Sequence, residues 1–245
     1  FTHYVRGLEG GFTLWVQDTF RNGVLSDVLS FHYLFVYLFL IWFSPMYYIL
    51  CRDEVMADKA VLNYFVAYVL AVPLYLFFNI EVTSSFLPGM DALMYHRSWN
   101  LFFFTEADPL DNGFPSLHIG IPLGLLAINR LHVRGLGIEM REWRHREFDL
   151  FVAANVPIYL FSIQYLGIHW ISDVVPGAML AIICALFAHN MQPKLRSLRE
   201  NGWSSLIPAR KVAYTSAAFS LIGTFILLAV VVDGPGTDDD APTMR

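Results

Sequence analysis

Residues 149–190 read DLFVAANVPIYLFSIQYLGIHWISDVVPGAMLAIICALFAHN and contain two hydrophobic stretches, 149–168 and 170–190, that are almost continuous. Each has about the 20 residues that an α-helix needs to cross a lipid bilayer. Only a tight turn around Gly167 can separate them. Two ionisable residues, His169 and Asp173, follow that turn. The segment therefore predicts a helical hairpin in a membrane, with a polar pair at the start of its second helix.

The whole chain has the composition of a membrane protein. Of its 245 residues, 56% are hydrophobic and only 15% are charged, which is too apolar for a soluble domain of this size. Besides the hairpin, four more stretches are long enough to cross a bilayer: 30–50, 60–80, 116–133 and 212–232. Gly120 and Gly124 have the spacing of a closely packed helix pair. We therefore expect an all-α integral membrane protein, a bundle of about six transmembrane helices over residues 30–232.

Both ends of the chain differ from this hydrophobic part. Residues 12–29 carry apolar side chains at near-helical spacing, interrupted by three charged residues, a pattern typical of a helix that lies on the membrane surface. The N-terminal segment 1–29 is therefore predicted to be interfacial and amphipathic. The sequence shows no pattern of a cleavable signal peptide. Residues 233–245 are rich in Gly, Pro and Asp, which predicts an acidic disordered tail.

The Lys and Arg residues predict the orientation, because cytoplasmic loops retain positive charge. Twelve of the sixteen lie in or beside the connections that follow the first, third and fifth stretches. The other four are Arg6, Arg21, Arg97 and Arg245. The amino terminus, the loop 81–115 and the Gly167 turn are therefore expected on the outer face of the plasma membrane.

His169 and Asp173 are four residues apart at the start of a predicted helix, so their side chains share one face. The carboxylate is then expected to accept the imidazole N–H, which leaves the other ring nitrogen available as a nucleophile or base. Ionisable groups at the edge of the hydrocarbon are costly and are by default functional. A buried pair that only locks two helices together is the alternative, and the pair taken alone favours it.

Residues 115–118, Pro-Ser-Leu-His, begin another predicted helix. Such a start leaves backbone N–H groups available and directs the positive end of the helix dipole toward a ligand, which suits phosphate. Ser116 as a simple N-cap and His118 as an interfacial residue are the alternative. The predicted topology brings His118 and His169 to one face of the membrane. Two histidines from different helices supply what in-line phosphoryl transfer requires, a nucleophile and a general acid.

These motifs resemble those of the type 2 phosphatidic acid phosphatase (PAP2) superfamily. Its pattern is Lys-x6-Arg-Pro, then Pro-Ser-Gly-His, then Ser-Arg-x5-His-x3-Asp. Residues 114–118 (FPSLH) match the second element, with Leu117 in place of Gly. The third element is matched by Ser162, His169 and Asp173, with Ile163 in place of Arg. The resemblance covers roughly residues 95–178 and looks closest to the branch that contains inositol phosphorylceramide synthase and sphingomyelin synthase.

The first element of that pattern is not recognisable here. Arg97 is not followed by Pro, and Met90 takes the place of Lys. The cations that neutralise the phosphate in the family are therefore reduced to Arg97. The further substrate-binding candidates are His96, Ser116 and Ser162. Because a phosphodiester carries less charge than a monoester, a clamp with fewer cations favours transferase chemistry.

The resemblance implies a covalent mechanism. His169 would attack phosphorus to form a phosphohistidine, and Asp173 would orient it. His118 would protonate the leaving oxygen and then deprotonate water or an alcohol. The mechanism requires no metal and no cofactor.

We therefore expect a membrane enzyme that cleaves or transfers a lipid phosphate ester, either a metal-independent lipid phosphatase or a phospho-headgroup transferase of the inositol phosphorylceramide synthase type. Its expected partner is the membrane lipid substrate, a lipid phosphate or phospholipid that includes polyprenyl and sphingolipid types, and not a nucleic acid. The alternative is a transporter or structural membrane protein in which the His–Asp pair couples ions. Polar groups at helix ends, rather than in broken helices at the midplane, favour the enzyme.

Overall fold

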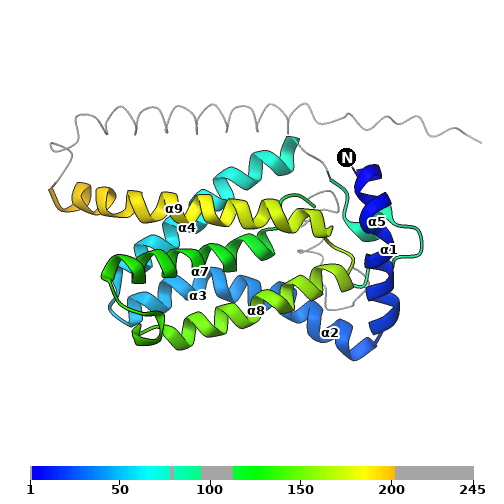
Figure 1. Ribbon diagram of the computed structural model, residues 1–245, viewed down its shortest axis with the longest axis horizontal. Coiled ribbons are helices and arrows are strands. Elements are labelled where there is room, and N and C mark those ends of the chain that lie inside the picture. The colour runs from blue at the N-terminus through cyan, green and yellow to red at the C-terminus, as the bar shows by residue number, and fades with distance from the viewer. Residues whose placement is uncertain (1, 78–79, 95–112, 202–245) are drawn as a thin grey trace, which may run out of the picture. The chain divides into compact units, whose positions relative to one another are not determined.

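The computed structural model describes residues 2–77, 80–94 and 113–201, and the regular elements in these ranges are helices (Figure 1). The α-helices are α1 (Thr2–Phe20), α2 (Gly23–Phe31), α3 (Tyr37–Leu50), α4 (Glu54–Phe77), the short α5 (Thr83–Phe86), α7 (Leu117–Leu136), α8 (Arg146–Tyr165) and α9 (Ile171–Asn201). A π-helical turn, His32–Val36, joins α2 to α3, and a short 3-10 turn, Met140–Glu142, precedes α8. The chain divides into residues 1–192 and 193–245, and of the second unit the structure describes residues 193–201, the end of α9.

The predicted helical character is confirmed in the described residues. Five of the predicted spans coincide with helices, namely α2 with α3, α4, α7, α8 and α9. The sixth span, 212–232, and the tail, 233–245, lie outside the described residues. In the described part, three continuous helical segments are long and apolar enough to cross a membrane: Gly23–Leu50, Glu54–Phe77 and Ile171–Asn201. A bundle of six crossings therefore stays a prediction.

Polar side chains explain why α7 and α8 are less apolar than the other long helices. Asn129 and Arg130 of α7 donate to the two carboxylate oxygens of Asp149 on α8, at 3.0 and 2.8 Å. Tyr48 of α3 donates to the side-chain oxygen of Asn129 at 3.1 Å. Since α7 packs against α3, α4 and α8, it lies inside the bundle, where these bonds satisfy its polar groups.

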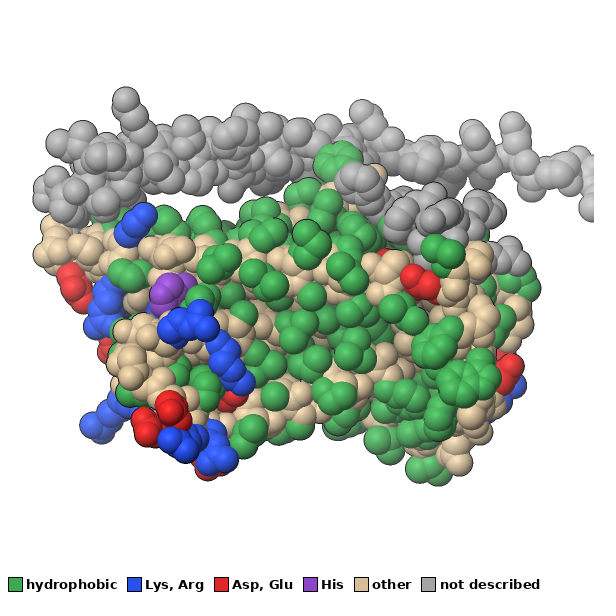
Figure 2. Space-filling model, in the orientation of Figure 1, with side chains coloured by type: hydrophobic (Ala, Val, Ile, Leu, Met, Phe, Trp, Pro, Cys, Tyr) green, Lys and Arg blue, Asp and Glu red, His purple; other side chains and the backbone are tan. Residues whose placement is uncertain are grey.

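The outward faces of α4 and α9 are apolar. Their exposed side chains follow helical spacing, and each is 45 to 65% exposed: Val61, Phe65 and Val69 on α4, and Val175, Met179, Ile182 and Leu186 on α9. Figure 2 shows a broad hydrophobic band across the face in view, which includes α9, with charged side chains gathered mostly toward one end. Such a band suits the hydrocarbon of a bilayer rather than water, so the apolar helices indicate membrane association.

The N-terminal segment differs from its prediction. The sequence predicts one helix over 12–29, and this is wrong, because α1 ends at Phe20 and α2 begins at Gly23. Asn22 is the physical reason. Its backbone is extended, and its side-chain oxygen accepts the N–H groups of the next helix at Val24 and Leu25, at 2.9 and 3.2 Å. As a result α2 runs on toward α3, while α1 packs across α8 at one end of the bundle (Figure 1).

A backbone contact joins α7 to α9. A Cβ on Gly177 of α9 would lie 2.5 Å from the Ser116 carbonyl oxygen, and one on Gly120 of α7 would lie 3.1 Å from the Gly177 carbonyl oxygen. The Ser116 N–H donates to the Asp173 carbonyl at 3.3 Å. The close packing predicted for Gly120 and Gly124 is confirmed. The absent side chain at Gly177 therefore allows the starts of the two motif-bearing helices to touch.

Gly177→Ala is expected to lower the thermal unfolding midpoint, because the new methyl group would overlap a backbone oxygen. Overpacking of this kind costs about 1–3 kcal/mol. Gly11→Ala is the matched control, since Gly11 is helical and exposed and an added Cβ there meets nothing within 4 Å. That helix should gain stability. Both midpoints are measured in detergent by tryptophan fluorescence, and equal values for the two variants would contradict the contact.

Candidate active site

The turn between α8 and α9 positions the first candidate residue. Gly167 has a φ of +77°, and a Cβ there would lie 2.8 Å from the Cβ of Ser84. Glycine adopts this left-handed backbone without strain and has no side chain to collide with Ser84. The Gly167 carbonyl accepts the Ser84 N–H at 2.9 Å, which attaches the turn to α5. The predicted tight turn is therefore confirmed, and His169 follows it, just before α9 begins at Ile171.

His169 is buried and is oriented by a backbone carbonyl. Its exposed fraction is 4%, and its Nδ1 donates to the Gly113 carbonyl at 2.7 Å. Gly113 is itself held by its N–H, which donates to the Ile80 carbonyl at 2.9 Å. With the hydrogen on Nδ1, the lone pair of the neutral ring lies on Nε2. The imidazole is thus oriented by an acceptor that the sequence does not indicate.

Asp173 does not accept the His169 N–H, contrary to the prediction. Its Oδ2 lies 3.8 Å from Nδ1, too far for a hydrogen bond, because His169 precedes the helix and does not share its face. Oδ2 instead accepts the Trp170 N–H at 2.9 Å, as a residue at the third helical position does in a capping box. Asp173 is fully buried. It therefore fixes the start of α9 and places a carboxylate beside His169.

His118 lies in the first turn of α7 against two tyrosine rings. Its ring centroid is 3.6 Å from that of Tyr33, at 16° between the planes, and 3.9 Å from that of Tyr37. Tyr33 belongs to the π-helical turn His32–Val36, and Tyr37 follows it. Such turns are frequent at functional sites. These ring contacts fix the orientation of the His118 imidazole.

The structure brings His118 and His169 together. Their ring centroids are 6.3 Å apart, and their planes differ by 52°. The two residues come from the starts of α7 and α9, which touch at Gly177. The Tyr159 ring lies 6.0 Å from that of His118. One substrate group can therefore contact both imidazoles.

The remaining candidates occupy different positions. Ser116 is the fully buried N-cap residue of α7, and its hydroxyl has no partner in the described residues. Ser162 is also buried, but its hydroxyl donates to a carbonyl of its own helix at 2.7 Å. Ile163, at the position of the family's arginine, is a core residue. His96 and Arg97 lie outside the described residues. In the part that is described, no group of three His, Cys, Asp or Glu side chains is placed to hold a metal ion.

A polar edge of α1 holds the turn that carries His169. Thr13 donates to the side-chain oxygen of Gln164 at 3.0 Å, and the Gln164 amide donates to the His169 carbonyl at 3.1 Å. The Glu9 carboxylate accepts the N–H of Ser172, in the first turn of α9, at 3.1 Å. The N-terminal helix therefore positions both the backbone of His169 and the start of the helix that follows it.

The sequence contains a signal for this role in the spacing of three polar residues. Glu9, Thr13 and Gln17 are spaced four residues apart and form one polar stripe along α1. Gln17 donates to the backbone carbonyl of the α8 end at 2.9 Å. Phe12 and Trp15, by contrast, are about half exposed, at 48% and 56%. The stripe predicts that α1 packs against the rest of the protein through its polar edge, but it does not indicate which residues that edge contacts.

The fold is similar to that of a solved membrane-protein structure. Neither a protein-family model nor the sequence of a curated protein matches the chain. The crystal structure of Aquifex aeolicus LpxE matches it with a TM-score of 0.56 and 17% sequence identity, over 75% of this chain and 95% of that chain. At this identity the similarity shows the fold alone.

Thr13→Val and Gln164→Leu are expected to be non-additive in stability. Either change alone leaves a buried polar partner unpaired, at a cost of about 1–3 kcal/mol. The second change should therefore cost less once the first is present, by about 0.5–3 kcal/mol. Thermal unfolding of the two single variants and the double variant measures this. The control pair is Thr13→Val with Ser44→Ala. The Ser44 hydroxyl contacts Tyr64 elsewhere in the bundle, so the stability costs of these two changes should add. Additivity in both pairs would show that α1 does not act through Gln164.

Proposed function

We propose that this protein is a membrane enzyme that cleaves or transfers a lipid phosphate ester, with His169 as nucleophile and His118 as general acid and base. One observation carries the proposal. Two imidazoles from the starts of different helices lie 6.3 Å apart, and one of them is oriented by the Gly113 carbonyl. The fold adds support, because LpxE is a lipid phosphatase of the PAP2 fold.

The chemistry proceeds in two displacements at phosphorus. Nε2 of His169 attacks phosphorus, and the N–P bond forms as the P–O bond to the leaving alcohol breaks. His118 gives its proton to that oxygen. His118 then takes a proton from water or from an acceptor alcohol, whose oxygen attacks phosphorus and breaks the N–P bond. Both histidines return to their starting state, and hydrolysis differs from headgroup transfer only in the acceptor.

The start of α7 is proposed to bind the phosphate oxygens. The first N–H groups of a helix have no partner within it, and the Ser116 hydroxyl beside them is buried without a partner in the described residues. At the start of α9, by contrast, the Ser172 N–H is already bound by Glu9. Arg97 and His96, which precede the described part of this region, are proposed to supply further positive charge. Such donors stabilise the charge that develops on phosphoryl oxygens.

The site is proposed to face the non-cytoplasmic side of the plasma membrane. Charged side chains gather mostly at the other end of the bundle, where α7 passes into α8 (Figure 2). The basic residues in or beside the two connections there are Arg52, Arg134, Arg141, Arg144 and Arg146. Positive charge is retained on the cytoplasmic side. The substrate is then a lipid phosphate or phospholipid of the outer leaflet.

His169→Ala is expected to reduce turnover of lipid phosphates and phosphodiesters by about 10⁴-fold or more, because it removes the nucleophile. Wild-type turnover should survive EDTA, and the wild type alone should form an acid-labile phosphoprotein. Asn190→Ala, at an exposed position of α9, is the control. Full turnover in His169→Ala, or turnover abolished by chelation and restored by a metal, would refute the proposal. Release of product to water alone, with alcohols present, would leave a phosphatase and remove the transferase.

The Asp173→Asn variant removes the negative charge of this residue but keeps an oxygen that can accept the hydrogen bond at the start of α9. The amide oxygen can still accept the Trp170 N–H, so the unfolding midpoint should change little. Loss of the negative charge beside His169 should lower kcat by about 10²-fold. Asp18→Asn, the same change at an exposed position of α1, should leave both quantities unchanged. A variant that loses stability and activity together would show that Asp173 acts only as a cap.

A further inference from the structure

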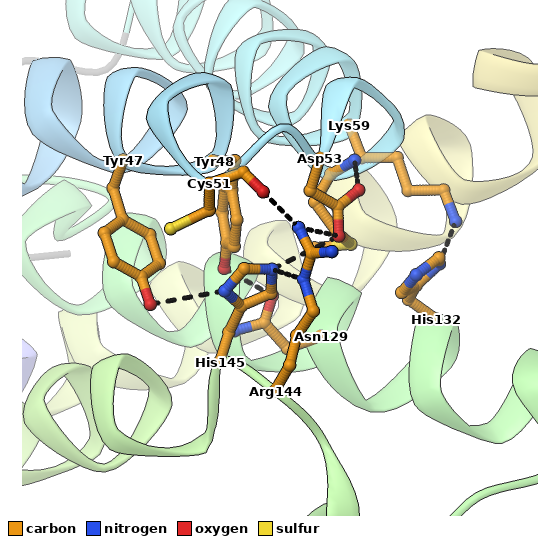
Figure 3. Close-up of polar contacts among 10 residues, drawn as sticks. Tyr47, Tyr48, Cys51, Asp53, Lys59, Asn129, His132, Arg144 and His145 are labelled. Atoms are coloured by element: carbon orange, nitrogen blue, oxygen red, sulfur yellow. Dashed lines mark hydrogen bonds and ion pairs between the residues drawn. The ribbon is translucent and has the colours of Figure 1, made fainter.

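A second cluster of ionisable side chains lies at the other end of the bundle from the catalytic pair. Lys59 of α4 is only 4% exposed. Its Nζ lies 3.1 Å from Nδ1 of His132 on α7 and 3.3 Å from Nδ1 of His189 on α9. Figure 3 shows the Lys59 side chain extended toward His132. Since His132 follows His118 by fourteen residues in one helix, the two clusters are about 21 Å apart along α7.

The ammonium group of Lys59 fixes the hydrogens of both imidazoles. A lysine side chain only donates, so each neutral ring accepts at Nδ1 and carries its hydrogen on Nε2. Lysine has three N–H donors, and the two histidines use two of them. One ammonium N–H and the two Nε2–H groups are then available to an acceptor that approaches from outside.

No carboxylate of the described residues lies within 4 Å of the Lys59 Nζ. Asp53, the acidic residue that acts on Lys59 from farther away, lies 3.2 Å from Nε2 of His145 and 3.6 Å from Arg144 (Figure 3). Burial lowers the pKa of His145, and its hydrogen bond to Asp53 raises it. Arg144 is the arginine that lies beside the Asp53 carboxylate.

Asp58, which precedes Lys59 in the sequence, accepts the Gln192 amide at 3.4 Å. A buried ammonium group without a counter-charge is strongly unfavourable. Figure 2 shows a histidine beside Lys and Arg side chains at this end of the molecule, where Asp and Glu side chains also lie. On either side lie the apolar outer faces of α4 and α9, with Phe65 and Leu186 exposed.

We propose that Lys59, His132 and His189 bind the phosphate group of an anionic phospholipid, whose acyl chains lie along the apolar faces of α4 and α9. Phosphate oxygens accept strong hydrogen bonds from ammonium and imidazole N–H groups. Basic sites between helices on the cytoplasmic side typically bind anionic headgroups. The ligand belongs to the leaflet opposite the one that supplies the substrate, and the proposal does not depend on the reaction at His169.

Thermal unfolding of the full chain, titrated with lipid in detergent, tests this. Phosphatidylglycerol should raise the wild-type midpoint, whereas phosphatidylcholine should not. Lys59→Met should weaken the response about tenfold or more, because it removes the charged donor. Arg134→Gln, the same charge loss at an exposed position of α7, should stay within about twofold of the wild type.

A second readout separates ligand binding from a structural role. In phosphatidylcholine alone, Lys59→Met should unfold at or above the wild-type midpoint, because it buries no unpaired charge. A lysine that only ties helices together would make this variant less stable there. His189→Phe keeps Lys59 and an aromatic ring at position 189 but removes both ring nitrogens. It should also weaken the response to phosphatidylglycerol. This variant decides the question if Lys59→Met does not fold.

Three outcomes would overturn the proposal. The wild type does not respond to phosphatidylglycerol, the variants respond as the wild type does, or Lys59→Met is destabilised in phosphatidylcholine. A separate titration with inorganic phosphate distinguishes the two sources of the anion. A rise in midpoint with inorganic phosphate, without one for phosphatidylglycerol, would also overturn the assignment to a lipid.

Discussion

The contact between Gly177 and the Ser116 carbonyl is the constraint on which the rest of the site depends. A side chain at Gly177 would lie 2.5 Å from that oxygen, so α7 and α9 can approach this closely only at a glycine. His118 lies two residues after Ser116, and His169 lies eight residues before Gly177. The crossing therefore sets the separation of the two imidazoles. The Gly167 turn, the Gly113 carbonyl and the edge of α1 then orient rings whose distance is already fixed.

The helices and the meeting of the two histidines could be predicted from the sequence, because hydrophobic length and the distribution of Lys and Arg report on them directly. The hydrogen-bond partner of His169 could not. Gly113 is 56 residues away, and the acceptor is a backbone carbonyl, which every residue possesses. The helix break at Asn22 has a readable cause in the capping preference of asparagine, but apolar spacing that continues across it indicates a single helix.

The lower hydropathy of α7 and α8 has a different physical reason. A hydropathy scale counts each polar residue separately, whereas Asn129 and Arg130 both donate to the buried Asp149 carboxylate. Paired in this way they cost far less to bury than their number indicates. The Ser116 hydroxyl, which has no partner in the described residues, and the Lys59 ammonium, which is bonded to two histidines, lie at opposite ends of the bundle. These two groups are the ones for which ligands are proposed.

The spacing of the two ends has a mechanical consequence for the lipid around the protein. His118 and His132 are separated by about 21 Å along α7, whereas the hydrocarbon core of a bilayer is about 30 Å thick. In a chain that crosses the bilayer, the two polar clusters are therefore closer together than the two layers of headgroups. The surrounding membrane must become thinner, or its headgroups must sink toward the protein. Either deformation shortens the path by which a phosphate leaves the headgroup layer and reaches the histidines.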